Sequence, residues 1–376
     1  PLNIPADKAE GLFDRADRNR LRELQRQVDQ FRAKSPVAPA RAMVLTDSER
    51  PFQPYVFVRG NPGNRGEEVP RRFLQVLAGA DREPFRDGSG RLELADAIAD
   101  PDNPLTARVM VNRVWMHHFG EGLVGTPSDF GLRSEPPTHP ELLDYLARRF
   151  MEPAGRSAAQ SGGRGEQGGA WSLKKLHRLI MLSQVYQQSS DLRPELRETD
   201  PDNRLLARMN RRRLDWEATR DSLLAVAGRL DRTVGGRSVE LFKEPYPTRR
   251  SLYGFIDRQN LPGVLRSFDF AIPDTHCPRR FVTTVPQQGL YLMNNAFVIE
   301  QAKALAAREE VARETDPERR ITVLYRLCFG RAPDAEEMAM GRAFVAGGGS
   351  GGGSALTAWE RYAQVLLLSN EFAFVD

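Results

Sequence analysis

Apolar residues recur with a helical period near the start of the chain. Within residues 6–33 the apolar positions include Leu21, Leu24, Val28 and Phe31, with charged and polar residues between them. This spacing of three and four residues predicts an amphipathic helix. We expect its apolar face to pack on the rest of the protein or on a module that precedes it.

The pattern then changes to a short β type. The runs ARAMVL and PYVFVRG are separated by polar residues, and the second run ends in the turn cluster NPGNRG. These signals predict a small β element near residues 41–61 and not a large sheet. The segment 234–281 is irregular and suggests further short strands and turns.

Helical spacing dominates from residue 91 onward. Two helix starts have proline in the first turn and fit capping boxes, Thr138-His139-Pro140-Glu141 and Thr284-Val285-Pro286-Gln287. The predicted helices lie near residues 104–119, 138–151, 172–187, 213–230, 284–309, 317–328, 334–345 and 355–372. The fold class is therefore mainly α, a multi-helix globular domain with a small β element near residues 41–61 and short strands within 234–281.

The same patterns predict three parts. Residues 1–40 form an N-terminal amphipathic helix at the end of an upstream module, residues 41–310 a main helical domain with minor β, and residues 311–376 a C-terminal helical subdomain. The first residue is proline and not methionine, so we interpret the chain as a segment of a longer polypeptide. Glycine-rich stretches at 154–170 and 347–354 predict flexible loops, and the second, GGGSGGGS, also has the composition of a synthetic linker.

Composition argues against several classes of protein. Among 376 residues, 54 are basic and 50 are acidic, which leaves a formal net charge of +4. Charge dispersed in this way is weak support for nucleic-acid binding, so we expect no nucleic-acid partner. No apolar run is long enough for a membrane span. Two cysteines, Cys277 and Cys328, are too few for a disulfide scaffold, a four-thiolate zinc site or a CxxCH haem attachment.

The histidine pair in NRVWMHHFGEGLV is the most conspicuous candidate for chemistry. Neighbouring residues on a helix point about 100° apart, so His117 and His118 cannot share one metal ion, and we assign no metal ligands. The glycines that follow predict a helix end. A catalytic site built from His118, Asp129 and His139 is a hypothesis, because the turn-rich segment TPSDFGLRSEPPTHP can fold back over the helix end. The simpler interpretation is that Asp129 caps a turn and His139 caps a helix.

Two arginine-rich segments offer charged sites. In HCPRRFVTTVPQQ, Arg279, Arg280 and Thr284 lie near a helix start and suit an anion-binding corner. The alternative is that the same arginines form internal salt bridges with the acidic segment DFAIPD. Further upstream, RRRLDWEATRD at 211–221 has arginines at helical spacing from its glutamate and predicts a charge-laced helical face.

Six blocks of the chain, taken together, resemble a known family. They are NPLTARVMVNRVWMHHFGEGLVGTPSDFG, THPELLDYLARRF, WSLKKLHRLIMLSQVYQQSS, DPDNRLLARMNRRRLDWEATRDSLLAVAGRLD, RRFVTTVPQQGLYLMNN and LYRLCFGRAPDAEE. This ordered set resembles the planctomycete-type C-terminal domain of unknown function found in large surface proteins with c-type cytochrome domains. The resemblance covers roughly residues 65–376, and the chain departs from the family at 154–170 and 347–354.

The resemblance implies a context more than an activity. It places the chain outside the cytoplasm, as a module of a bacterial surface protein whose haem lies in an upstream domain, with no cofactor in this segment. The expected partners are the upstream domains of the same parent chain and a polysaccharide. We therefore expect binding or scaffolding, related to carbohydrate. One alternative is a hydrolase, metal-assisted in one version, that acts on polysaccharide or its substituents, and the least favoured alternative is nucleic-acid binding.

The family's most recognisable motif also suggests a ligand site. It matches Asn112, Arg113, Trp115, Gly120, Gly122 and Asp129. Asn112, Arg113 and Trp115 on one helix suggest a polar, aromatic-backed pocket for a sugar ring or a carboxylate. The other interpretation is that Arg113 pairs with a buried acid and Trp115 fills the core.

Overall fold

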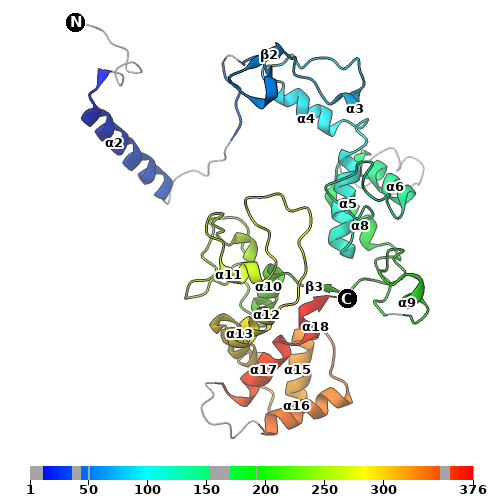
Figure 1. Cartoon of the computed structure of the whole chain (residues 1–376). Coiled ribbons are helices and arrows are strands. Elements are labelled where there is room, and N and C mark those ends of the chain that lie inside the picture. The colour runs from blue at the N-terminus through cyan, green and yellow to red at the C-terminus, as the bar shows by residue number, and fades with distance from the viewer. Residues whose placement is uncertain are drawn as a thin grey trace, which may run out of the picture. The chain divides into compact units, whose positions relative to one another are not determined.

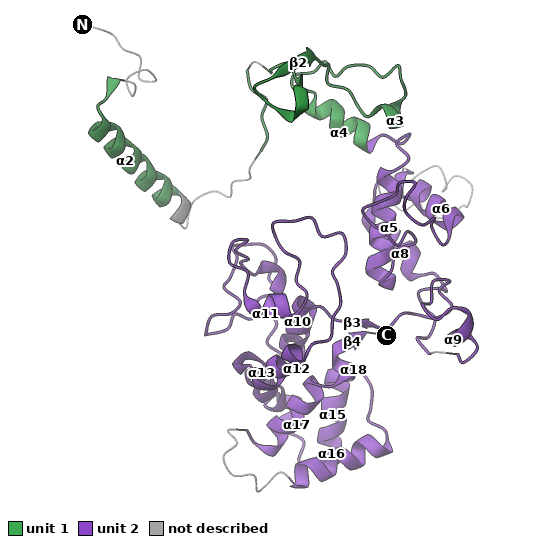
Figure 2. Cartoon of the chain, in the orientation of Figure 1, with its two compact units in different colours: residues 1–98 green, residues 99–376 purple. Residues whose placement is uncertain are grey.

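The chain divides into two compact units in a computed structural model that describes residues 12–35, 44–49, 51–152, 170–191, 193–347 and 356–375. Unit 1 comprises residues 1–98 and unit 2 comprises residues 99–376 (Figure 2). The predicted flexible loops at 154–170 and 347–354 lie outside the described residues, apart from one end residue of each. The predicted divisions after residues 40 and 310 stay predictions.

Unit 1 contains one long helix and a small hairpin. Its elements are α2 (Arg15–Lys34), β1 (Tyr55–Phe57), η2 (Val58–Gly60), β2 (Arg65–Glu68), α3 (Gln75–Ala78) and the start of α4 (Arg91–Ala99). The Asp14 carboxylate accepts a hydrogen bond of 2.8 Å from the Asp17 N–H and caps α2. Strands β1 and β2 pair antiparallel with Tyr55 opposite Glu68, which confirms a small β element, but the hairpin spans residues 55–68 and its second strand follows the turn cluster.

Unit 2 is helical. Its longer helices are α5 (Thr106–Phe119), α6 (Pro140–Met151), α8 (Leu173–Met181), α10 (Trp216–Val226), α12 (Pro286–Asn294), α13 (Ala296–Ala306), α15 (Pro317–Phe329), α16 (Ala335–Gly347) and α17 (Ala358–Leu367) (Figure 1). Its short elements are α9 (Leu196–Thr199), β3 (Arg212–Arg213), η3 (Ser251–Tyr253), α11 (Gly263–Ser267), α14 (Glu309–Ala312), α18 (Asn370–Ala373) and β4 (Phe374–Val375). The prediction of a mainly α fold is confirmed.

The predicted helix 284–309 is two helices, because Asn295 interrupts it. Asn295 has extended backbone angles, ends α12 and begins α13, where its side chain accepts a hydrogen bond of 2.9 Å from the Phe297 N–H. Ser369 separates α17 from α18 in a similar way, because its side chain accepts a hydrogen bond from the Phe372 N–H. A short polar side chain that satisfies the backbone locally competes with helix continuation.

Helix starts also differ from the predicted capping boxes by one residue. The N-caps of α6 and α12 are His139 and Val285, and neither side chain makes a capping hydrogen bond. The hydroxyl of Thr138 instead donates to the Leu123 carbonyl oxygen. The short strands expected within 234–281 are reduced to two isolated bridges, Asp231 with Arg249 and Val239 with Gly254.

Three apolar clusters hold unit 2 together. The first joins α5, α6 and α8 through buried residues that include Val111, Phe119, Leu143 and Ile180. The second joins α10, α13, α15 and α17 through residues that include Leu223, Val298, Ile321 and Ala363. The third is smaller and includes Trp216, Leu241 and Leu265. Burial of this apolar surface is the dominant favourable contribution to folding.

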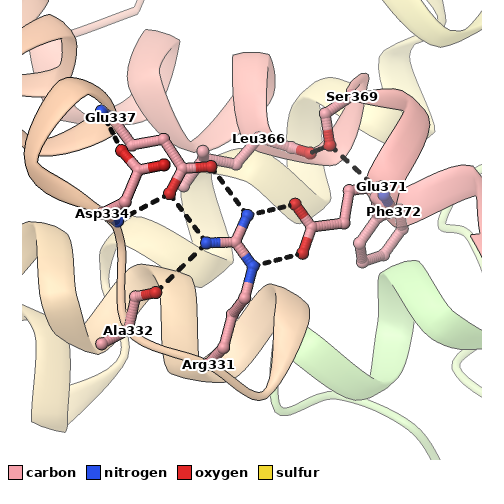
Figure 3. A network of polar contacts seen from close by, with 8 residues as sticks. All are labelled: Arg331, Ala332, Asp334, Glu337, Leu366, Ser369, Glu371 and Phe372. Atoms are coloured by element: carbon pink, nitrogen blue, oxygen red, sulfur yellow. Dashed lines mark hydrogen bonds and ion pairs between the residues drawn. The ribbon is translucent and has the colours of Figure 1, made fainter. Parts of the chain in front are cut away.

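A polar network ties the ends of three C-terminal helices. Arg331 follows α15, and its guanidinium donates to Glu337 of α16 and to Glu371 of α18 at 2.6–2.7 Å (Figure 3). Asp334 and Glu337 also exchange backbone-to-carboxylate hydrogen bonds of 2.8 Å at the start of α16. The guanidinium holds the pKa of the Glu337 carboxyl below its ordinary value. Because Arg331 is bidentate to both acids, the network has the geometry in which ion pairs stabilise most.

Candidate functional site

An arginine-rich hollow of unit 2 lies where segments distant in sequence meet. It has a volume of about 710 Å³ and contains the five arginines Arg211, Arg212, Arg213, Arg279 and Arg280. We call it the arginine cleft. Its other walls come from the end of α5, from the segment 268–284 and from β4.

A two-stranded ribbon forms one wall of the cleft. Strand β3 pairs antiparallel with β4, with Arg213 directly opposite Phe374, and the Leu214 N–H donates to the Ala373 carbonyl oxygen at 2.8 Å. Directly opposed residues of an antiparallel pair lie on the same face, so the guanidinium stem of Arg213 and the ring of Phe374 are neighbours. The C-terminal end of the chain thus holds the arginine strand in place.

A glycine allows the approach of Arg212 to α5. Gly120 ends α5 with a φ of +86°, and a Cβ built there would lie 3.1 Å from the Cδ atom of Arg212. The Arg212 guanidinium donates to the His117 carbonyl oxygen in the last turn of this helix. A cation at a helix C-terminus is stabilised by the helix dipole, which is the local reason for this contact.

Two of the arginines are neutralised by glutamates. Arg280 makes a two-pronged ion pair with Glu217 of α10 at 2.8 and 2.9 Å and lies 4.6 Å from the centre of the Phe270 ring. Arg279 makes a two-pronged ion pair with Glu121. The acids of DFAIPD are therefore not their carboxylate partners. Hydrogen bonding to Glu217 raises the pKa of the Arg280 guanidinium above its ordinary value.

The charge-laced helical face predicted within residues 211–221 is wrong at its start. The sequence predicts Arg213 and Arg220 at helical spacing from Glu217, but Arg213 lies in β3, because α10 begins only at Trp216. Asp215 caps α10 and accepts from the Ala218 N–H at 2.8 Å. Glu217 is bound to Arg280 instead, and Arg220 is buried.

Of the predicted ligand residues on α5, two are inside the protein. Asn112 is fully buried, and its amide exchanges hydrogen bonds of 2.9 and 3.0 Å with the Val124 backbone. Trp115 is 4% exposed and stacks on Phe119 with ring centres 4.2 Å apart. Arg113 has a buried Nε atom without a hydrogen-bond partner. These contacts fit a helix that holds the fold together.

The three predicted catalytic residues each have local partners. His118 Nε2 lies 2.8 Å from Nδ1 of His177, and His139 Nδ1 lies 3.0 Å from the Thr138 hydroxyl. Asp129 accepts from the Gly131 N–H at 2.8 Å, as a turn cap does. Within the described parts of the chain, no group of three or more histidine, cysteine, aspartate or glutamate side chains has a metal-binding arrangement.

One further pair was not predicted. The Ser128 hydroxyl lies 2.8 Å from Nε2 of His276, which joins the segments TPSDFG and HCPRR. Both residues are exposed. In the described residues His276 has no second hydrogen-bonded partner, so the third group that orients a catalytic histidine is missing. Nothing in the spacing of two distant segments signals such a pair.

The comparisons with known proteins add a family. Residues 90–345 match the family model PSD1, described as a protein of unknown function (DUF1553), and this match covers more than half of the chain. The chain belongs to this DUF1553 family. A search of the curated proteins finds no match. A search of the solved structures finds none either.

The match to DUF1553 includes most of the arginine cleft. All five of its arginines lie within residues 90–345, whereas Phe374 of β4 lies outside. Thr284, the remaining predicted ligand residue, is an exposed residue at the cleft wall ahead of α12. Among the described residues, no helix combines the length and the apolar character needed to cross a bilayer.

The contact between His118 and His177 predicts that the stability of this DUF1553 chain depends on pH. Burial, then the charge of His177, lowers the pKa of His118 below its ordinary value of 6.5. As the pH falls, the unfolded chain therefore binds more protons at this position than the folded chain does. The free energy of unfolding falls accordingly as the pH drops through about 6.5.

We expect His118→Gln to lose less unfolding free energy than the wild type between pH 7.5 and pH 5, two values that roughly bracket the titration of histidine. Urea unfolding of both proteins at both pH values measures this difference. His117→Gln is the matched control, because the neighbouring side chain is exposed. If the unfolding free energy of the His118 variant changes with pH as much as that of the wild type, His118 is not the group that causes the pH dependence.

Proposed function

We propose that this chain is a binding module of a multidomain protein that works outside the cytoplasm, and that it takes a carbohydrate ligand in the arginine cleft. The observation that carries the proposal is the cleft itself, which brings guanidinium groups, threonine hydroxyls and open aromatic rings into one hollow of about 710 Å³. Pockets that bind small ligands combine apolar walls with a few polar groups that fix the orientation.

The aromatic side chains of the cleft fit a sugar ring. Phe281 is 84% exposed and Phe374 is 40% exposed, although phenylalanine is usually buried. A sugar presents apolar C–H faces as well as hydroxyl groups, and an aromatic ring beside hydrogen-bonding groups matches both. Exposed phenylalanine at a cleft wall is thus more consistent with a ligand surface than with packing.

The setting of the module rests on the resemblance. The planctomycete-type surface protein with upstream c-type cytochrome domains is the context that we propose for the parent chain. Haem belongs to those upstream domains in this proposal, and no step in this segment uses it. The upstream domains and a polysaccharide are the proposed partners.

Hydrolysis is supported less well than binding. A hydrolase built on His118, Asp129 and His139 requires these side chains to meet, but each is bonded to a different neighbour. The Ser128 and His276 pair has the distance of a nucleophile and its base, yet both side chains are open to solvent. Efficient acyl transfer needs a base held by a third group and donors aimed at the oxyanion.

A glycan array tests the proposed function. We expect the full chain to retain a subset of the printed oligosaccharides and Phe281→Ala to weaken that binding about five- to tenfold, the usual effect of removing an aromatic anchor. Phe52→Ala is the matched control, because Phe52 is 77% exposed and lies in unit 1. A uniformly blank array, or equal loss in both variants, would count against the proposal.

A further inference from the structure

Two arginines of the cleft have no carboxylate partner among the described residues. Within the described part of the chain, Arg212 donates to the His117 carbonyl oxygen alone, and Arg213 donates to the Thr283 carbonyl oxygen at 2.9 Å and to the Gln288 amide oxygen. Carbonyl and amide oxygens are neutral, so both positive charges remain uncompensated. This contrasts with Arg279 and Arg280, which each face a glutamate.

Both side chains also keep unused donors. A guanidinium has five N–H groups, and in each of these arginines the contacts to described residues engage only Nη1. Both residues are half-buried, and none of their nitrogen atoms is among the buried atoms that lack a partner. The unused nitrogens of Arg212 and Arg213 are therefore open to solvent, and can meet a ligand.

The acids at the cleft wall are engaged elsewhere. Asp269 accepts hydrogen bonds of 2.8–2.9 Å from the backbone N–H and the hydroxyl of Thr283. Asp215 caps α10, and its carboxylate is 3.9 Å from Arg280. Neither acid is paired with Arg212 or Arg213, so these two acids do not neutralise the two arginines at close range.

We propose that the cleft selects carbohydrates that carry an anionic group, a carboxylate of a uronic acid or a sulfate ester, and that Arg212 and Arg213 bind that group. This inference rests on the proposed function and names the class of its ligand. Both groups present oxygens at the spacing that a guanidinium binds with two parallel hydrogen bonds. Such charged hydrogen bonds are stronger than the neutral ones that a plain sugar hydroxyl makes.

The cleft fits a charged glycan better than a nucleic acid. Nucleic-acid binding needs a basic track along many phosphates, and its affinity comes mainly from many such contacts. Here the uncompensated charge is confined to neighbouring residues on one short strand, flanked by Arg279 and Arg280 with their glutamates. A single acidic substituent on a sugar matches this small patch.

Calorimetric titration of the full chain tests the inference. The probes are a galacturonate hexamer, the same hexamer with every carboxylate methyl-esterified, a sulfated chondroitin hexamer whose uronate carboxylates are reduced to alcohols, the same carboxyl-reduced hexamer without sulfate, and a duplex DNA. We expect at least one acidic glycan to bind at least tenfold more tightly than its neutral counterpart, and its affinity to fall with added salt. The galacturonate and chondroitin arms separate a carboxylate from a sulfate as the source of the charge.

Variants test whether Arg212 and Arg213 bind the acidic group of the glycan. We expect Arg212→Gln to weaken binding of the acidic glycan at least about tenfold and to leave the neutral glycan unchanged. Because Arg213 also holds Thr283 and Gln288, Arg213→Lys accompanies Arg213→Gln, and both are compared with the wild type by thermal unfolding. Arg313→Gln is the matched control, because it removes the same charge from a side chain that is 77% exposed.

Each outcome decides one question. Equal affinity for acidic and neutral glycans would leave carbohydrate binding intact and overturn the charge selection. Binding of neutral glycans alone would do the same. Failure of every glycan would overturn the proposed function together with this inference. DNA binding that is as tight as glycan binding and equally sensitive to Arg212→Gln would overturn the glycan assignment in favour of a nucleic acid.

Discussion

Replacing Arg220 with methionine is expected to lower the free energy of unfolding by roughly 3–5 kcal/mol. Arg220 lies in α10 and is only 2% exposed. Its guanidinium donates to the carbonyl oxygens of Pro247 and Arg249 and lies 5.0 Å from the centre of the Phe297 ring. Methionine fills similar space but leaves both carbonyl groups without a donor.

The charge of Arg220 is buried, which makes its contacts expensive to break. Burial lowers the pKa of this guanidinium below its ordinary value, since the charged form loses hydration. Asp221 lies 3.8 Å away and accepts hydrogen bonds of 2.7 Å from the N–H and hydroxyl groups of Ser251. Removing Arg220 therefore also takes away one of the two cations near this partly buried carboxylate and leaves Arg250, at 3.7 Å.

Urea unfolding of purified variants measures this prediction. Arg313→Met is the matched control, because that side chain is 77% exposed and pairs with Glu309, an exposed glutamate one helical turn away. We expect the control to change stability by no more than about 0.5 kcal/mol. A loss below about 1 kcal/mol for Arg220→Met would show that the loop around residues 247–251 is held by other contacts.

Replacing Asn112 with alanine is expected to lower the free energy of unfolding by about 2–4 kcal/mol. The Asn112 amide is fully buried and satisfies both the N–H and the carbonyl group of Val124. It also lies against Gly122, where an added Cβ would fall 2.8 Å from the amide nitrogen. Alanine leaves two buried backbone groups unpaired at the turn that follows α5.

This result separates the two interpretations of the α5 motif. If Asn112 bound a ligand, the alanine variant would fold normally and lose binding, so chemical denaturation and glycan titration are measured on the same protein. Asn294→Ala is the matched control, because its amide donates to the Leu290 carbonyl oxygen on an exposed face. We expect the control to stay within about 0.5 kcal/mol of the wild type. Normal stability of Asn112→Ala together with lost binding would refute the structural role.

Part of the candidate site was visible in the sequence. Arg279, Arg280 and Thr284 were predicted as an anion-binding corner, and all three line the arginine cleft. Their spacing before a helix start is a local signal, and local signals are readable in one sequence. The structure also shows that Arg279 and Arg280 are neutralised by glutamates, which no local pattern indicated.

The arginines with unused donors were not predicted as a site. Arg212 and Arg213 belong to a strand of two residues that forms only because the C-terminal strand β4 pairs with it. A two-residue strand has no periodicity of its own, and its partner is far away in the chain, so nothing local distinguishes it from the helix that follows.

The sequence by itself determined the helical fold class, the small β element and most helix positions, because hydrophobic period and proline-marked starts are properties of neighbouring residues. It did not determine which polar residues are buried. Asn112 and Arg220 look like surface residues in the sequence, yet each is enclosed by segments that arrive from elsewhere in the chain. Only the tertiary structure decided this, since burial and charge compensation depend on non-local neighbours. For Arg212 and Arg213 the neighbours are carbonyl groups, which leave the two positive charges of the cleft without a carboxylate among the described residues.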